Sequence, residues 1–155
     1  MITTLRILLT VAACVAGSAV ADDGSRYMPA KPSPAYQQEC GSCHVAYPPG
    51  LLPAPSWQRL LAGLRSHFGA DASVEPAMMK ELSTYLSANA GTSRRTAEEP
   101  SQDRITRLSW FLREHRKVPD ATWKLAAVKS AANCTACHTQ ADKGDYSERN
   151  IRIPR

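Results

Sequence analysis

Apolar residues recur at helical spacing in several parts of the chain, and we find no convincing strand pattern. Ser56 and Ser73 are residue types that cap helix N-termini, and Gly69 is a natural stop. Segment 47–53 cannot be regular helix, because its prolines lack the amide donor and clash with the preceding turn. The periodicity predicts helices over 56–68, 74–86 and 101–115, and a short helix near 123–129. The pattern therefore predicts an all-α chain with extended loops and little or no strand.

The first and third predicted helices each carry one histidine on the apolar stripe. His67 lies three residues after Leu64, and His115 extends a stripe that includes Phe111 and Leu112. The middle helix carries a stripe that includes Met78, which we assign to core packing. The stripes of the two histidine-bearing helices comprise Trp57, Leu60, Leu61, Leu64, Phe68, Ile105, Leu108, Phe111 and Leu112.

The N-terminal 21 residues have the pattern of a cleaved secretory signal. Arg6 precedes an uncharged apolar run over 7–20, which is too short to span a bilayer comfortably and ends at a small-x-small site before Asp22. The sequence predicts cleavage after Ala21, export to the periplasm and no membrane insertion afterwards. A lipoprotein signal at Cys14 is the rival interpretation, but the apolar run continues past that cysteine.

The other four cysteines fall in two copies of one motif. Residues 40–44 read Cys-Gly-Ser-Cys-His, and residues 134–138 read Cys-Thr-Ala-Cys-His. Cys-x-x-Cys-His is the attachment signature of haem c. Two cysteines three apart lie on one side of a helical turn and can form thioethers with the two vinyl groups of one porphyrin. The histidine that follows then points its imidazole at the iron. We predict two covalent haems, attached through Cys40, Cys43, Cys134 and Cys137, with His44 and His138 as iron ligands.

Other uses of four cysteines explain the motif less well. A disulfide framework gives no reason for a histidine at both fifth positions. A thioredoxin-like pair requires a βαβ context, and a zinc site tolerates the spacing without requiring the histidines. The chain carries 19 Lys/Arg against 14 Asp/Glu, but haem propionates would offset most of this excess. Because no Lys/Arg run of the binding kind occurs, we do not expect a nucleic-acid partner.

The two remaining histidines are candidates for the far side of each iron. His67 follows His44 by 23 residues, and His115 precedes His138 by 23 residues. The simplest pairing keeps each haem within its own half, with His44 and His67 on haem 1 and His115 and His138 on haem 2. Crossed ligation remains open at this point.

The motif positions divide the chain into halves. We predict a signal over 1–21, an N-terminal haem domain over 22–91 and a C-terminal haem domain over 92–155. The polar stretch 90–100 reads as a linker, with Arg94 and Arg95 solvated. Because so few residues surround each haem, the porphyrins must form much of each core, and the protein without haem should be largely unfolded.

The sequence resembles the small dihaem cytochrome c family of periplasmic electron carriers, often abbreviated DHC. The resemblance covers nearly all of the chain after the signal, and its most specific pieces are Tyr47-Pro48-Pro49 and His67-Phe68-Gly69. The other matching segments are 39–44, residue 46, 51–54, 56–57, 85–86, 104–106, 110–111, 114–115, 133–134 and 153–155.

The resemblance implies two domains with one bis-histidine haem each, the N-terminal one similar to a class I cytochrome c. It also implies redox partners: a small oxygen-binding monohaem cytochrome c, and a membrane b-type cytochrome as electron source. From this we expect a monomeric, low-potential electron carrier that is not an enzyme. The alternative is a dihaem peroxidase or gas-binding protein in which one distal histidine dissociates.

Overall fold

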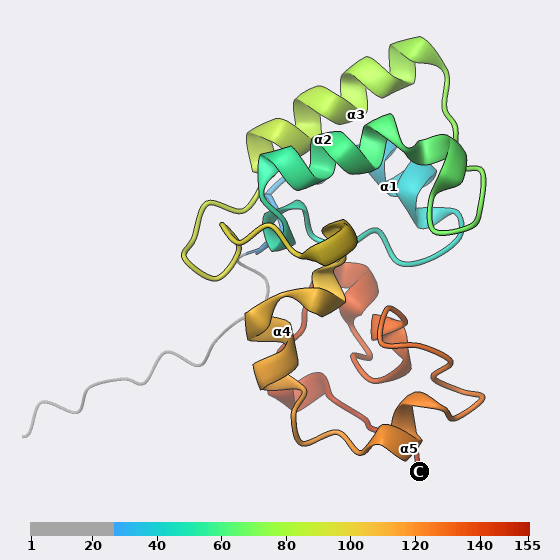
Figure 1. Cartoon of the computed structure of the whole chain (residues 1–155), viewed down its shortest axis with the longest axis vertical. Helices are drawn as coiled ribbons and strands as arrows, with labels where there is room; N and C mark the ends of the chain where they lie inside the picture. Colours follow the sequence, from blue (N-terminus) through green and yellow to red (C-terminus); the bar gives the residue numbers. More distant parts are fainter. Residues whose placement is uncertain (1–26) are drawn as a thin grey trace, which may run out of the picture.

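The computed structural model describes residues 27–155, so the predicted signal over 1–21 lies outside the described residues. Figure 1 shows an upper group, which contains the helices before residue 90, and a lower group, which contains the later and shorter helices. The α-helices are α1 (Pro34–Gly41), α2 (Ala54–Ala62), α3 (Pro76–Asn89), α4 (Ser109–Glu114) and α5 (Asp120–Trp123). Residues 27–155 form no sheet, only isolated β-bridges. The all-α prediction is therefore confirmed. No helix in this range is long and apolar enough to cross a membrane.

Prolines lie in the first turns of the first three helices. Ser33 caps α1, with its hydroxyl accepting from the Tyr36 N–H, whereas the serine caps predicted for α2 and α3 are not formed. Each of these helices has a proline at one of its first two positions, where a missing N–H costs nothing. The cap positions of α2 and α3 are therefore Pro53 and Glu75, not Ser56 and Ser73. Ser56 is buried inside α2, where its hydroxyl accepts a hydrogen bond from Arg59.

The helix predicted over 56–68 ends early. α2 stops at Ala62, and a 3₁₀ turn over Leu64–Ser66 follows. The chain then reverses through two residues with positive φ, Phe68 at 48° and Gly69 at 100°. Glycine adopts this backbone without steric cost, whereas phenylalanine rarely does. As a result His67 sits at the entry of a tight turn rather than on a helix face.

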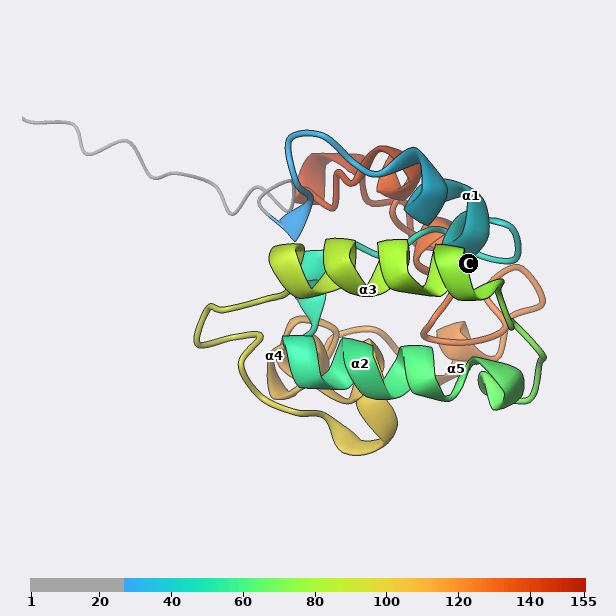
Figure 2. The same cartoon turned by 90° about the horizontal axis from the view of Figure 1, so that it is seen from above.

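One apolar cluster joins the two groups of helices. α2 and α3 lie side by side (Figure 2), and α1 packs against α3. The cluster also includes Leu108 and Phe111 from the lower group, and Leu108 is fully buried. Its buried members are Tyr36, Leu52, Trp57, Leu61, Leu82, Leu86, Leu108 and Phe111. Met78 packs against the cluster, as predicted.

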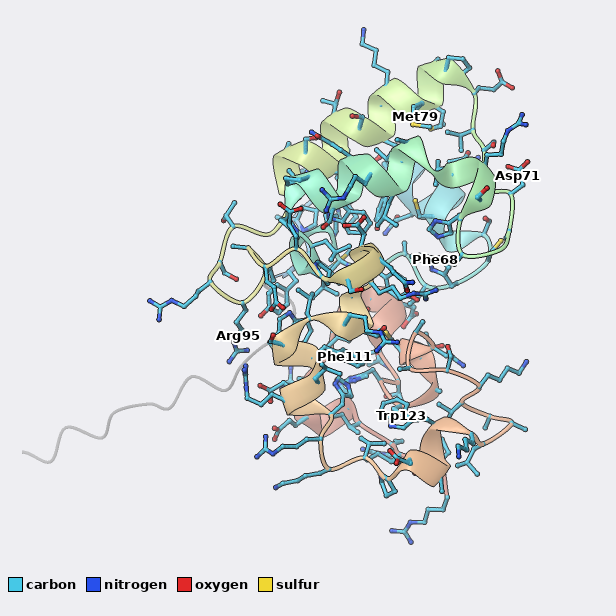
Figure 3. The ribbon with its side chains drawn as sticks, in the orientation of Figure 1. Phe68, Asp71, Met79, Arg95, Phe111 and Trp123 are labelled. Carbon is cyan, nitrogen blue, oxygen red and sulfur yellow. The ribbon has the colours of Figure 1, made fainter. Side chains whose placement is uncertain are left out.

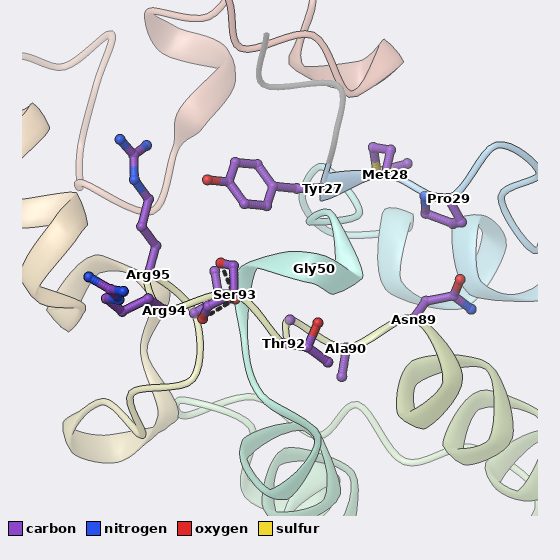
Figure 4. Close-up of a pocket in the computed structure, with 12 residues that line it drawn as sticks. Tyr27, Met28, Pro29, Gly50, Asn89, Ala90, Thr92, Ser93, Arg94 and Arg95 are labelled. Carbon is purple, nitrogen blue, oxygen red and sulfur yellow. Dashed lines mark hydrogen bonds between the residues drawn. The ribbon is translucent and has the colours of Figure 1, made fainter. Parts of the chain in front are cut away.

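Segment 90–100 is largely exposed, as predicted, and Arg94 and Arg95 lie at the surface, but parts of the segment pack against the upper group. Gly91 donates its N–H to the Leu52 carbonyl at 2.8 Å, and Thr96 is fully buried. A surface pocket of about 450 Å³ separates this segment from Tyr27 and its neighbours, and no histidine lines it (Figure 4). Just beyond the segment, Asp103 accepts two hydrogen bonds from Arg59 of α2. The boundary predicted at residue 91 stays a prediction, but the chain around it packs against the upper group.

The C-terminal half contains little regular structure. α4 has six residues and α5 has four, and the rest is loops and short 3₁₀ turns. Leu112, predicted on the buried stripe of α4, is 55% exposed. The buried stripe there is narrower than predicted, because two 3₁₀ turns take the place of α-helix before Ser109 and leave α4 with only six residues. Beyond α4 the buried hydrophobic residues are only Val128 and Ala141.

Candidate haem sites

The first site gathers residues from α1, the following loop and the turn after α2. Cys40 lies in the last turn of α1, and Cys43 and His44 follow it on the surface. The imidazoles of His44 and His67 face each other, with ring centroids 6.3 Å apart and planes inclined by 24°. The early end of α2 and the turn through Phe68 place His67 opposite His44.

The second site gathers residues from α4 and a 3₁₀ turn. Cys134 begins the turn Cys134–Ala136, and the His138 N–H donates to the Cys134 carbonyl at 2.8 Å. His115 directly follows the last residue of α4. The ring centroids of His115 and His138 are 6.1 Å apart, and their planes are inclined by 66°.

Both centroid separations suit one metal atom between two imidazoles. A nitrogen–metal bond of about 2 Å, with about 1 Å more from the nitrogen to the ring centre, gives about 6 Å across the metal. The observed 6.3 and 6.1 Å are too long for a direct ring–ring hydrogen bond and too short for an intervening side chain. Each facing pair joins two histidines of the same half of the chain, His44 with His67 and His115 with His138.

Backbone carbonyls select which ring nitrogen is left for a metal. His44 Nδ1 lies 2.8 Å from the Val45 carbonyl, and His115 Nδ1 lies 2.9 Å from the Phe111 carbonyl. A carbonyl only accepts, so both Nδ1 atoms carry the hydrogen and both Nε2 atoms keep a free lone pair. This tautomer is the one in which histidine binds a metal through Nε2 while a backbone group orients the ring.

The surroundings favour neutral imidazoles at both sites. Burial lowers the pKa of His67, and the neighbouring His44 and Arg104 lower it further. Burial also lowers the pKa of His138, with His115 acting in the same direction and Asp145 opposing it. Only the neutral ring binds a metal, so these shifts suit iron ligands. His138 Nδ1 is buried and has no hydrogen-bond partner among the described residues.

The four motif cysteines form no disulfide with one another, and they do not form a thiol cluster. Burial raises the pKa of both Cys40 and Cys134 to about 11, the opposite of the low pKa of redox-active or nucleophilic thiols. Within residues 27–155, no three His, Cys, Asp or Glu side chains converge as a metal site of their own. Each pair of thiols instead stands beside one facing pair of imidazoles. This donor set fits a covalently attached haem with a ligand on each face.

Aromatic side chains surround both imidazole pairs. Phe68 and Phe111, which lie near the contact between the two groups of helices in Figure 3, contact His67 and His115 with ring centroids 4.8 and 4.0 Å apart. The ring centroids of Trp123 and His115 are 6.0 Å apart, and those of Tyr146 and His138 are 5.3 Å apart. These rings provide flat apolar surfaces of the kind that a porphyrin requires.

Sequence reasoning did not identify the groups that orient the ligands. The Phe111 carbonyl, four residues before His115, orients the His115 ring. Because helical carbonyls lie one turn before the residue they contact, the place of His115 at a helix end could have indicated this partner. Arg104 lies over the Phe68 ring, with its Cζ 4.0 Å from the ring centroid, and it helps to lower the pKa of His67. Nothing in the local sequence indicates that Arg104 packs against the turn that holds His67.

An all-α chain with two Cys-x-x-Cys-His segments, each beside a facing pair of imidazoles, defines a c-type cytochrome with two haems. The chain belongs to the dihaem cytochrome c family, whose sequence model matches residues 36–146. This range contains all eight predicted site residues. The chain therefore carries two covalently attached haems c, as the sequence predicted.

Solved structures agree with this assignment. The chain is 40% identical to a diheme cytochrome c from Rhodobacter sphaeroides, with a TM-score of 0.66 over 74% of this chain and 96% of that one. It is 35% identical to a diheme cytochrome type c from Shewanella baltica OS155, with a TM-score of 0.69 over 78% of this chain and 92% of that one. Among curated proteins, none matches the chain.

Proposed function

We propose that the protein is a periplasmic electron carrier in which two histidines hold each haem iron. His44 and His67 serve the first site, and His115 and His138 serve the second. The observation that supports this proposal best is the spacing of the facing rings, 6.3 Å in the first pair and 6.1 Å in the second. The thiols that would attach the two haems are Cys40, Cys43, Cys134 and Cys137.

The bound haem supplies a one-electron couple at its iron, and the chain determines how that couple behaves. Imidazole nitrogens on both faces keep the coordination the same in both oxidation states, so little structure has to change when an electron enters or leaves. A histidine in place of methionine also lowers the potential, because methionine ligation raises it. If both imidazoles of each pair bind the iron, peroxide and oxygen would have no free coordination position. These properties are those of a low-potential carrier rather than an enzyme.

We further propose that the partners are other redox proteins. A membrane b-type cytochrome would supply electrons, and a small oxygen-binding monohaem cytochrome c would receive them. Family resemblance supports both partners. The predicted signal peptide supports the periplasm as the place where they meet.

A two-armed mixing experiment tests the carrier function. In the first arm, the fully reduced protein is mixed with an oxidised small monohaem cytochrome c and followed by stopped-flow absorbance. We expect up to two electrons per molecule to pass to the acceptor. In the second arm the protein is mixed with hydrogen peroxide and an excess of a reduced donor, and we expect no catalytic turnover.

Either of two results would contradict the proposal. Sustained peroxide turnover would establish a peroxidase with a labile distal histidine. Failure of the reduced protein to reduce any small monohaem cytochrome c would remove the carrier function. A peroxide control with free haem fixes the background rate in the second arm.

A further inference from the structure

Tyr47 contacts both haem-binding segments. Its ring stacks on the ring of His44, with centroids 4.7 Å apart and planes inclined by 19°. Its hydroxyl donates a hydrogen bond of 2.6 Å to the carbonyl of Ala132, which is 85 residues away in the sequence. Ala132 comes two residues before Cys134, the first thiol of the second site. One side chain therefore bridges an iron ligand of the first site and the attachment segment of the second.

The backbone of Tyr47 is held in place from the side of the first site. The Tyr36 hydroxyl donates to the Tyr47 carbonyl at 2.6 Å, and Tyr36 is buried in α1, four residues before Cys40. Pro48 and Pro49, which follow Tyr47, are also buried. Tyr47 thus has little freedom to move relative to either site.

The hydroxyl of Tyr47 stays a donor under ordinary conditions. A phenol is protonated at neutral pH, and this one donates to the Ala132 carbonyl at 2.6 Å. A short hydrogen bond between a partly buried hydroxyl and a backbone carbonyl is costly to lose, because the carbonyl would be left without its partner. The connection should therefore persist in solution.

We propose that Tyr47 is a positioning residue that couples the two haem sites, both in their relative placement and in electron exchange between them. This inference rests on the proposed carrier function. The connection runs from the His44 ring through the Tyr47 ring and hydroxyl to the Ala132 carbonyl, and along the backbone to Cys134. In one exchange event, an electron leaves the ferrous iron of one site and reduces the ferric iron of the other. Tyr47 is neither oxidised nor deprotonated.

The variant Tyr47→Phe separates the hydroxyl from the ring. It keeps the stack on His44 and removes only the bond to Ala132. In half-reduced protein, we expect electron exchange between the haems, measured by NMR exchange spectroscopy, to slow several-fold. The low-spin optical spectrum and both midpoint potentials should stay close to those of the wild type. Tyr47→Leu should slow the exchange further and alter the spectroscopic signature of the first haem, because the stack on His44 is also lost.

Tyr146→Phe is the matched control. Tyr146 contacts His138 at the second site, but its buried hydroxyl has no hydrogen-bond partner among the described residues. Removing that hydroxyl breaks no hydrogen bond and keeps the ring on His138, so exchange should slow less than in Tyr47→Phe. Equal exchange rates in Tyr47→Phe and wild type would overturn the inference. Slowing by Tyr146→Phe as large as that by Tyr47→Phe would also overturn it, because the effect would then not depend on the bond to Ala132.

Failure of the proposed function gives a different result from failure of the coupling. A high-spin iron in the wild-type protein would refute two-histidine ligation. The comparison of exchange rates between Tyr47→Phe and Tyr146→Phe tests only the coupling between the two sites.

Discussion

Replacing His67 with methionine should raise the midpoint potential of the first haem by on the order of 0.1 V, a modest part of the roughly 0.8 V range that axial ligands set. Methionine stabilises the reduced iron relative to a second imidazole. Its unbranched, flexible side chain can adapt to the turn that holds His67. The potential of the second haem should stay nearly unchanged, because His115 and His138 form a separate pair. Protein-film voltammetry measures both potentials in one experiment.

The matched variant is His115→Met, which should raise the potential of the second haem instead. In the wild-type protein we expect both potentials to be negative. If His67→Met left both potentials unchanged, His67 would not be an iron ligand. If it shifted the haem attached through Cys134, ligation would be crossed between the halves.

Removing the second attachment site should unfold most of the C-terminal half. We expect the double variant Cys134→Ala, Cys137→Ala to lose protection from hydrogen exchange across residues 115–155. Beyond α4, the buried hydrophobic residues of this half are only Val128 and Ala141, and the only α-helix there is α5, with four residues. Such a segment buries too little apolar surface to offset its conformational entropy without the porphyrin. Hydrogen exchange measured by mass spectrometry shows which segments lose protection.

The reciprocal variant Cys40→Ala, Cys43→Ala is the control. The N-terminal half has a larger core, formed by α1, α2 and α3 around Leu82 and Leu86. It should therefore keep more helical circular dichroism without its haem than the C-terminal half keeps without its own. Full protection of residues 115–155 in the Cys134, Cys137 variant would contradict the view that the haem forms the core there.

Local sequence signals identified the helices better than their ends. The periodicity located α2 and α3, because their apolar residues face one core. It missed the early end of α2, since the stripe continues through Leu64 while the backbone tightens into a 3₁₀ turn. It also placed Leu112 in the core, although α4 is too short to bury a wide stripe.

The candidate site was predicted more completely than the fold around it. The Cys-x-x-Cys-His motif names six site residues by itself, and the count of four histidines supplies the other two. Facing geometry could not be predicted, because it depends on how turns far apart in the sequence pack together. The same is true of Tyr47, whose partner Ala132 is 85 residues away.

The most direct test of two-histidine ligation is low-temperature electron paramagnetic resonance of the oxidised protein. We predict low-spin ferric signals from both haems and no high-spin signal. The ring planes are inclined by 24° at the first site and 66° at the second, so the two low-spin signals should be distinguishable. A high-spin signal that accounts for one haem would contradict the account, because it would show an iron that lacks its second histidine.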